Sequence, residues 1–240
     1  TEVEETPELR AFREIVTSRR SVRKFDPTPI PESVLRDCVE LALTAPNSSN
    51  LQPWEFHIIK NKELMGALVP ACFGQNAART AQAMIAVIAR TDTWSQHAKE
   101  ILEQWPEGTI PKLAHSYYAK LVPIYYQQGP FGIFGLLKRI GFTIAGFFRP
   151  VPRAPFSHAD MKLWATKSTA LAAENLMLAL RAHGYDSCPM EGFDEARIRK
   201  ILNLERKKSV VMLVAAGKRA KDGVYGPQFR FESERFIHMK

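Results

Sequence analysis

A run of three arginines and one serine lies near the N-terminus, at residues 19–23, with the sequence Arg-Arg-Ser-Val-Arg. Arginine forms paired, charge-assisted hydrogen bonds with phosphate oxygens, and a serine hydroxyl adds a neutral donor. The run could therefore hold a phosphate group. It directly follows a predicted helix, so the alternative is a solvated basic surface that complements the negative end of the helix dipole.

A second polar cluster occupies residues 45–54, Ala-Pro-Asn-Ser-Ser-Asn-Leu-Gln-Pro-Trp, between a predicted helix and a predicted strand. Its amide and hydroxyl groups offer both donors and acceptors in a small space. That combination suits the polar edge of a heteroaromatic ring. The alternative is a turn whose asparagine and serine side chains bond to their own backbone.

A third segment, residues 186–194, has the sequence Asp-Ser-Cys-Pro-Met-Glu-Gly-Phe-Asp and is expected to be a loop that leads into a helix. Gly192 would allow a ligand to approach the backbone closely, and the free N–H groups of the first helical turn could donate to that ligand. The alternative is an ordinary loop in which Asp194 caps the following helix.

Together the three segments resemble the nitroreductase family of flavoenzymes. That family carries a basic R-x-S-x-R/K near the N-terminus, then A-P-S-S-x-N-x-Q-P-W, a W-x-x-K helix leading to P-x-E-G-F-D, and an arginine near the C-terminus. This chain matches with residues 19–23, 45–54, Trp164 with Lys167, 189–194 and Arg230. Asn47 departs from the pattern, because it stands where the family usually has serine, but it remains polar.

The resemblance implies an FMN site in which the basic run binds the phosphate and ribityl chain and Arg23 reaches the pyrimidine edge of the flavin. The second cluster would come from the other subunit of a homodimer, and the third would pass beneath the ring with a backbone N–H directed at flavin N5. Gln75 would face the flavin, and Arg230 would bind phosphate. The cofactor-binding residues predicted in this way are Arg19, Arg20, Ser21, Arg23, Pro46, Asn47, Ser48, Asn50, Gln75, Pro189, Met190, Glu191, Gly192 and Arg230.

The resemblance also implies a ping-pong reaction, in which NAD(P)H gives hydride to flavin N5 and is then replaced by a nitroaromatic, quinone or similar acceptor. No catalytic side chain is expected, because the flavin carries the chemistry. The sequence has no G-x-G-x-x-G after a strand and no P-loop, so the nicotinamide is expected to bind directly over the flavin. Reductive dehalogenation, flavin cleavage and dehydrogenation are alternative reactions for the same fold.

Cysteine and histidine usage predicts neither a nucleophile nor a metal site. Cys188 has no recognisable histidine or acid partner, so a packed thiol is favoured over a nucleophile, and His57 in a strand-like run is expected to be structural. The three cysteines are far apart, and the histidines lack metal-ligand spacing. A reducing compartment, the cytoplasm, is expected, and residues 1–10 show no signal-peptide pattern.

Apolar periodicity predicts the elements that must position these groups. Helices are expected at 7–18, 31–44, 160–183 and 194–204, and strands at 54–60, 84–90 and 209–216. Strands separated by helices indicate the α+β or α/β class. The resemblance implies an α+β, three-layer fold with a central mixed sheet flanked by helices, in an intertwined homodimer. All 240 residues are interpreted as one FMN-binding domain with an insertion at about 108–159.

That insertion contributes +6 of the net charge of +8, because residues 108–159 contain six lysines or arginines and no aspartate or glutamate. The segment also holds ten of the 24 aromatic residues. A nucleic-acid partner is not expected, since no recognised binding motif accompanies the charge. The segment falls where substrate caps vary in the family, so the resemblance does not predict the substrate.

Residues 131–148 form the apolar centre of the insertion but carry Lys138 and Arg139 in their middle. Two adjacent charges at that depth argue against a transmembrane helix. We favour an arm that packs in the dimer. The alternative is a membrane-surface flavin-binding module, in which aromatic residues lie in an anionic lipid interface beside the cations. Those aromatic residues are Phe131, Phe134, Phe142, Phe147 and Phe148.

Overall fold

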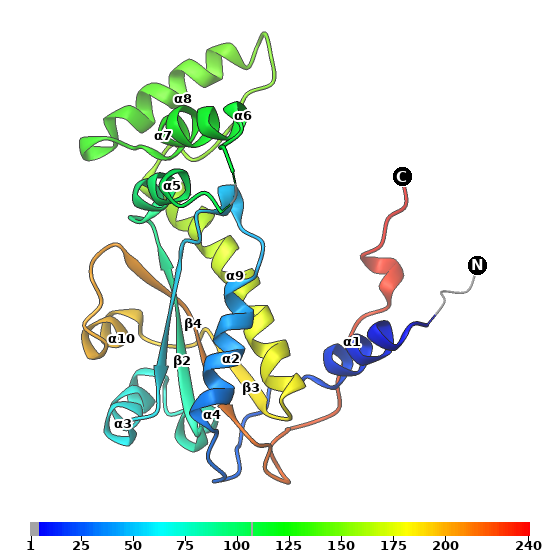
Figure 1. The fold of residues 1–240 in the computed structure, drawn as a ribbon. Helices are drawn as coiled ribbons and strands as arrows, with labels where there is room; N and C mark the ends of the chain where they lie inside the picture. The colour runs from blue at the N-terminus through cyan, green and yellow to red at the C-terminus, as the bar shows by residue number, and fades with distance from the viewer. Residues whose placement is uncertain (1–4, 107) are drawn as a thin grey trace.

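The computed structural model describes residues 5–106 and 108–240. Four strands form one sheet in the order β1-β2-β4-β3 (Figure 1). All three pairings between these strands are antiparallel. An isolated parallel bridge between Ser21 and Ser187 joins the N-terminal segment to β3, but the four-stranded sheet itself is antiparallel and not mixed as expected. The strands are β1 (Trp54–Ile59), β2 (Ala83–Arg90), β3 (Asp186–Met190) and β4 (Lys208–Gly217).

The two central strands, β2 and β4, are buried on both faces, which explains their continuous apolar sequence. Alternate residues of β2 enter two separate cores: Met84 and Ile88 face one, and Ile85 and Val87 face the other. Helices α3 (Lys62–Ala71), α4 (Asn76–Thr80) and α10 (Glu195–Ile201) cover the first face. Helices α2 (Glu32–Leu43) and α9 (His158–Ala182) cover the second, so the expected three-layer α+β arrangement is confirmed.

Helix boundaries follow local capping signals. The long helix α9 begins two residues before the expected position because Ser157 accepts a hydrogen bond from the Asp160 N–H and Asp160 accepts one from the Ser157 N–H. It ends before Gly184, whose φ of 76° lies in the left-handed region that favours glycine. Asp194 caps α10 through the Arg197 N–H, as expected.

One expectation about secondary structure is wrong. Residues 186–190 were expected to be a loop, but they form the edge strand β3. Its polar residues obscure the pattern: Asp186 is buried because Arg181 and Arg219 both bind its carboxylate. Pro189 is compatible with a strand only at an edge, where one side of the backbone needs no partner.

The acid-free insertion lies within an arm at one end of the sheet, far from both chain termini in Figure 1. Leu51, Val122, Tyr126 and Trp164 belong to the core that joins the arm to the body. The arm's elements are α5 (Trp94–Glu103), α6 (Lys112–Ser116), a π-helical turn η2 (Tyr117–Leu121), α7 (Val122–Tyr126), a 3₁₀ turn η3 (Pro130–Gly132) and α8 (Ile133–Ala145).

The N-terminal helix α1 (Pro7–Ser18) extends away from the sheet and buries none of its side chains within one protomer (Figure 1). The C-terminal segment beyond Gly226 is also exposed and contains one short 3₁₀ turn, η4 (Ser233–Arg235). A further 3₁₀ turn, η1 (Ser48–Asn50), precedes β1. No helix in the described ranges combines the length and the apolar character needed to cross a bilayer.

Candidate functional site

The first and third sequence segments lie side by side in the structure. The chain leaves α1 at Arg19 and runs along the edge strand β3, where the Val22 N–H donates to the Ser187 carbonyl oxygen over 3.0 Å. Val22 is fully buried, and Phe25 anchors the end of the run in the same core. The backbone of the basic run is therefore held in a fixed direction beside β3.

The three arginines of this run have no ion pair with a carboxylate in residues 5–106 and 108–240. Arg20 donates from Nη2 to the Gly226 carbonyl oxygen at 2.7 Å. The Arg23 guanidinium lies 5.7 Å from the centre of the Tyr225 ring. Positive charge without a protein counter-ion is suited to a bound anion.

Cys188 of β3 lies close enough to the basic run for the arginine charges to affect the pKa of its thiol. Burial raises the pKa of the Cys188 thiol, while the Arg23 and Arg19 cations act in the opposite direction. The net shift is upward, so the thiol stays neutral at ordinary pH. This agrees with the expectation of a packed thiol.

Gln75 reaches the end of the third segment. Its Nε2 donates to the Gly192 carbonyl oxygen over 2.7 Å, and Gly192 has no other atom within 4 Å of the place where a Cβ would stand. Asp194 N–H bonds to the Ala71 carbonyl oxygen, which fixes this loop against α3. The Gly192 N–H itself donates no hydrogen bond to another described residue, so an open, donor-bearing loop faces outward beside Gln75.

The second sequence segment lies at the opposite end of the sheet. Trp54 at the start of β1 pairs with Ala89, whereas Ser187 pairs with Ala216 and, through it, with Ala83. Six residues of strand separate Ala83 from Ala89, a distance of about 20 Å. Within one protomer, residues 46–50 and the basic run therefore cannot contact one ligand headgroup together.

Residues 47–52 adopt a strained turn held by contacts to the arm. Ser49 has a φ of 62° although it is not glycine. Its hydroxyl lies 2.6 Å from the Tyr117 hydroxyl and 3.0 Å from the Tyr126 hydroxyl. The Asn47 Oδ1 accepts from the Gln52 N–H, as the alternative of a self-bonded turn expects. The serines, however, bond outside the turn, so the arm shapes this loop.

Arg230 makes no contact with the basic run among the described residues of one protomer. It lies on the exposed C-terminal tail, and its Nη1 donates to the Phe229 carbonyl oxygen at 2.7 Å. The tail instead contributes Tyr225 and Gly226, which contact Arg23 and Arg20 and which the sequence motifs did not identify. Tyr225 also accepts from the Asn76 Nδ2 at 3.0 Å. The only sequence signal for these residues is the irregular polar tail itself.

Comparison with known proteins identifies this arrangement of elements. A family model described as the nitroreductase family matches residues 16–218. The chain belongs to the nitroreductase family. The expectation drawn from the sequence motifs is confirmed, and the protein is an oxidoreductase of this family.

Relatives with curated names support the assignment. The chain is 30% identical over 219 residues to a protein of Thermus thermophilus named NADH dehydrogenase, covering 91% of each chain. It is 31% identical over 216 residues to YdgI of Bacillus subtilis, assigned as an NAD(P)H nitroreductase, covering 88% of this chain and 90% of that one.

A solved structure shows the same fold with a bound flavin. It is a nitroreductase-type protein of Exiguobacterium sibiricum in complex with FMN, with a TM-score of 0.70, 27% identity and full coverage of both chains. A nitroreductase of Bacillus subtilis, ydfN, has a TM-score of 0.75 at 24% identity, with 97% and 100% of the two chains covered.

Proposed function

We propose that this protein is an FMN-dependent oxidoreductase that takes electrons from NAD(P)H and passes them to a nitroaromatic, a quinone or a similar acceptor. One observation supports the proposal most strongly. In a nitroreductase fold, the arginine run at residues 19–23, which has no carboxylate partner among the described residues, lies along β3, the strand that leads to the Gly192 loop. We further propose that all 240 residues form one flavin-binding domain, with the arm as an insertion.

The residues present fit an FMN molecule. Arg19, Arg20 and Ser21 would hold the phosphate, because cations without carboxylate partners favour a dianionic group. Pro189, Met190, Glu191 and Gly192 would border the ring, with Gln75 beside them. One further observation agrees with a polar ligand near β3: the Ser187 hydroxyl is buried and has no partner among the described residues.

We propose that the complete site forms in a homodimer. Pro46, Asn47, Ser48 and Asn50 lie at the wrong end of the sheet to meet the basic run of their own protomer, so the partner would supply them. Arg230 belongs to the same set, because its tail is exposed in one protomer. The support is a set of exposed apolar side chains on α1, α9 and the tail: Phe12, Val16, Leu163, Leu171, Phe229, Phe231 and Phe236.

When bound, FMN would accept hydride from NAD(P)H and release the electrons to the acceptor in a separate half-reaction. The protein would position the ring and tune its charge. Arg23 is placed to stabilise negative charge at the pyrimidine edge, and the Gly192 N–H is a donor available to the ring. No side-chain acid or base is needed, in agreement with a neutral, buried Cys188.

An anaerobic visible spectrum of the purified protein tests this function. Flavin bands should bleach when NADPH or NADH is added and return when a nitroaromatic or a quinone follows. Bands that bleach but do not return would keep the flavoenzyme and remove those acceptors. A colourless protein that takes up no added FMN would contradict the proposal.

Size-exclusion chromatography with light scattering tests the dimer. Mixing an Asn50→Ala chain with an Arg19→Ala chain then provides a sharper experiment. If the partner completes each site, the heterodimer carries one intact site and one doubly altered site, so it should regain up to half the flavin of wild type. Failure to regain flavin would place both residues in one protomer's site.

A further inference from the structure

Helix α8 points its apolar face into solvent. Ile133, Leu137, Ile140 and Ile144 recur at the spacing of one helix face, and Leu136 borders them. All five side chains are more than half exposed. In most surface helices such a stripe faces the core. We call these five residues the outer face of α8.

The opposite side of α8 fixes this orientation. Gly135 packs so closely that a Cβ there would collide with the Phe156 carbonyl oxygen and the Gln128 side-chain oxygen. The Lys138 Nζ donates to the Tyr125 carbonyl oxygen at 2.8 Å, and burial lowers its pKa. Phe142 packs edge-on against Phe156, with 5.8 Å between ring centres. Lys138 therefore points toward the rest of the arm while the isoleucines point into solvent. The contacts of the inner side of α8 fix this orientation.

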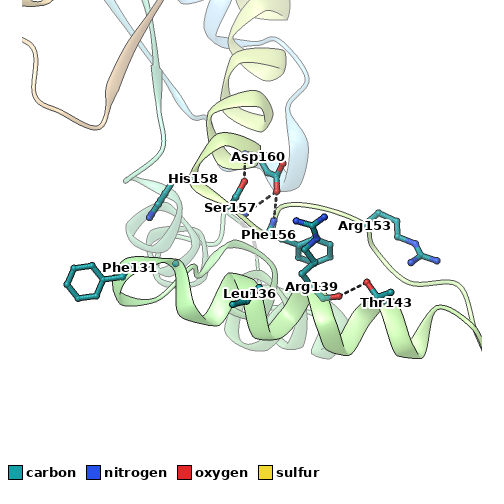
Figure 2. Close-up of a pocket in the computed structure, with 10 residues that line it drawn as sticks. Phe131, Leu136, Arg139, Thr143, Arg153, Phe156, Ser157, His158 and Asp160 are labelled. Atoms are coloured by element: carbon teal, nitrogen blue, oxygen red, sulfur yellow. Dashed lines mark hydrogen bonds between the residues drawn. The ribbon is translucent and has the colours of Figure 1, made fainter.

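Aromatic side chains extend the exposed apolar surface at both ends of α8. Phe131 is 98% exposed, and Phe147 and Phe148 are 82% and 86% exposed. Phe131 also has a φ of 54°, an unfavourable backbone conformation for a bulky residue. Figure 2 shows its ring pointing away from the other side chains around it. Exposed apolar side chains gathered along one helix and at its ends are typical of an interaction site.

Three arginines lie on α8 and in the segment that follows it. Arg139, Arg149 and Arg153 have no ion pair in the part of the chain that the structure describes, and residues 108–159 contain no acid. Arg139 and Arg153 line a hollow of about 620 Å³ between α8 and the start of α9 (Figure 2). Asp160 also lines it, but its carboxylate already accepts from the Phe156 and Ser157 N–H groups.

We propose that α8, with its flanking phenylalanines and arginines, binds the surface of an anionic lipid bilayer. The outer face would lie parallel to the membrane, at the boundary between headgroups and acyl chains, with Arg139, Arg149 and Arg153 against the lipid phosphates. Charge favours this occupant over the α8 surface of a second copy of the chain. Two α8 surfaces related by a two-fold axis would bring like charges together, whereas an anionic membrane complements them.

Sedimentation of the full-length, FMN-loaded protein with vesicles tests the proposal. Vesicles of phosphatidylcholine with phosphatidylglycerol should carry the protein down at low ionic strength, and vesicles of pure phosphatidylcholine should carry down much less. High salt should release most of the bound protein, because screening weakens attraction at a surface. Absence of binding to the anionic vesicles at low ionic strength would overturn the proposal.

Matched substitutions assign the binding to α8. Leu137→Gln with Ile140→Gln should lower vesicle partitioning by about tenfold or more, since both residues would leave the lipid interface. Leu113→Gln changes a leucine on α6 that is even more exposed, and it should leave partitioning unchanged. Arg149→Gln should cost about fivefold at low salt, whereas Arg206→Gln on the body should cost little. Equal losses in the α8 variants and in their controls would overturn the assignment.

Two measurements on the same preparations separate membrane binding from misfolding and from self-association. Flavin content and far-UV circular dichroism should be unchanged in every variant, which shows that lost vesicle binding does not come from unfolding or from loss of the cofactor. Light scattering should show the same oligomeric state with and without Leu137→Gln. A variant that changes the oligomeric state would show that the outer face contacts another copy of the chain, and would overturn the membrane proposal.

Discussion

Two groups of arginines in this protein lack carboxylate partners among residues 5–106 and 108–240, and the backbone holds them in different ways. The run at residues 19–23 follows the edge of the sheet, with Val22 fully buried and hydrogen-bonded to Ser187. The arginines of the arm instead border α8, whose apolar face is exposed. Arginine side chains without carboxylate partners therefore lie in two different surroundings in this protein.

We expect this difference in geometry to decide which anion each arginine cluster would bind. Side chains on a fixed backbone can be held toward one ligand, which suits a single phosphate in one orientation. Arginines spread around an exposed apolar helix meet many headgroups in no fixed orientation, which suits a lipid surface. Arg181 and Arg219 give the contrast, because a buried carboxylate, that of Asp186, already occupies them.

The largest expected effect is a loss of FMN affinity when the arginine run at residues 19–23 is changed, but not when the arginines of the arm are changed. Arg19→Ala should weaken FMN binding by about tenfold to a hundredfold, since a hydrogen bond to a charged group contributes about 1.5–3 kcal/mol. Ser21→Ala should have a smaller effect in the same direction. Titration of the apoprotein with FMN, followed by flavin fluorescence, measures both. Arg139→Ala is the matched control and should bind FMN like wild type; unchanged affinity in both Arg19→Ala and Ser21→Ala would contradict the phosphate assignment.

The next effect concerns the docking of α8. Gly135→Ala should destabilise the arm by about 1–3 kcal/mol, because the added methyl group overpacks the contact with Phe156 and Gln128. Gly141→Ala lies on the same helix with no atom within 4 Å of its new Cβ, so it should stabilise the helix slightly. Limited proteolysis within residues 129–157 measures the difference. Equal protease sensitivity in the two variants would show that the close contact is unimportant.

A moderate effect is expected where α9 begins beneath the hollow. The Phe156 N–H, bonded to the carboxylate, is the main cause that lowers the pKa of Asp160. Asp160→Asn should therefore lower the free energy of unfolding at neutral pH, by less than about 1 kcal/mol because solvent screens this largely exposed carboxylate. Because the folded pKa is depressed, this stabilisation is present above the ordinary pKa of about 4 and is lost as pH falls through the folded value. Denaturant unfolding at neutral and acid pH measures it, and a pH-independent difference would disprove the ionic contribution.

The smallest expected effect is a very slow reaction of the three cysteine thiols with Ellman's reagent in the native protein. Burial raises the pKa of Cys38 to about 12 and of Cys72 to about 11, and it also raises the pKa of Cys188. The native protein should therefore react very slowly with Ellman's reagent at mildly alkaline pH, since only thiolates attack it. All three thiols should react after denaturation. Rapid reaction of Cys188 in the native protein would reopen its interpretation as a nucleophile.

Much of the fold could be predicted because the information is local. The apolar runs of β2 and β4 and the Ala/Leu-rich period of α9 mark buried elements directly, and Gly184 and Asp194 mark helix ends through short-range backbone geometry and hydrogen bonds. The family could be predicted for the same reason, since its motifs are contiguous. Strand β3 could not, because a buried aspartate and an edge proline depend on partners distant in sequence.

The placement of the site and of the arm depends on the tertiary structure alone. The sequence indicated that residues 19–23, 45–54 and 186–194 matter, but sheet register decides that the first and last meet while the middle one lies at the other end. Tyr225 and Gly226 join the site only through the path of the tail. The sequence likewise shows that residues 131–148 are apolar around Lys138 and Arg139, but only packing through Gly135 and Lys138 decides that the apolar face of α8 points outward. A helical period states which residues share a face, and long-range contacts decide where that face points.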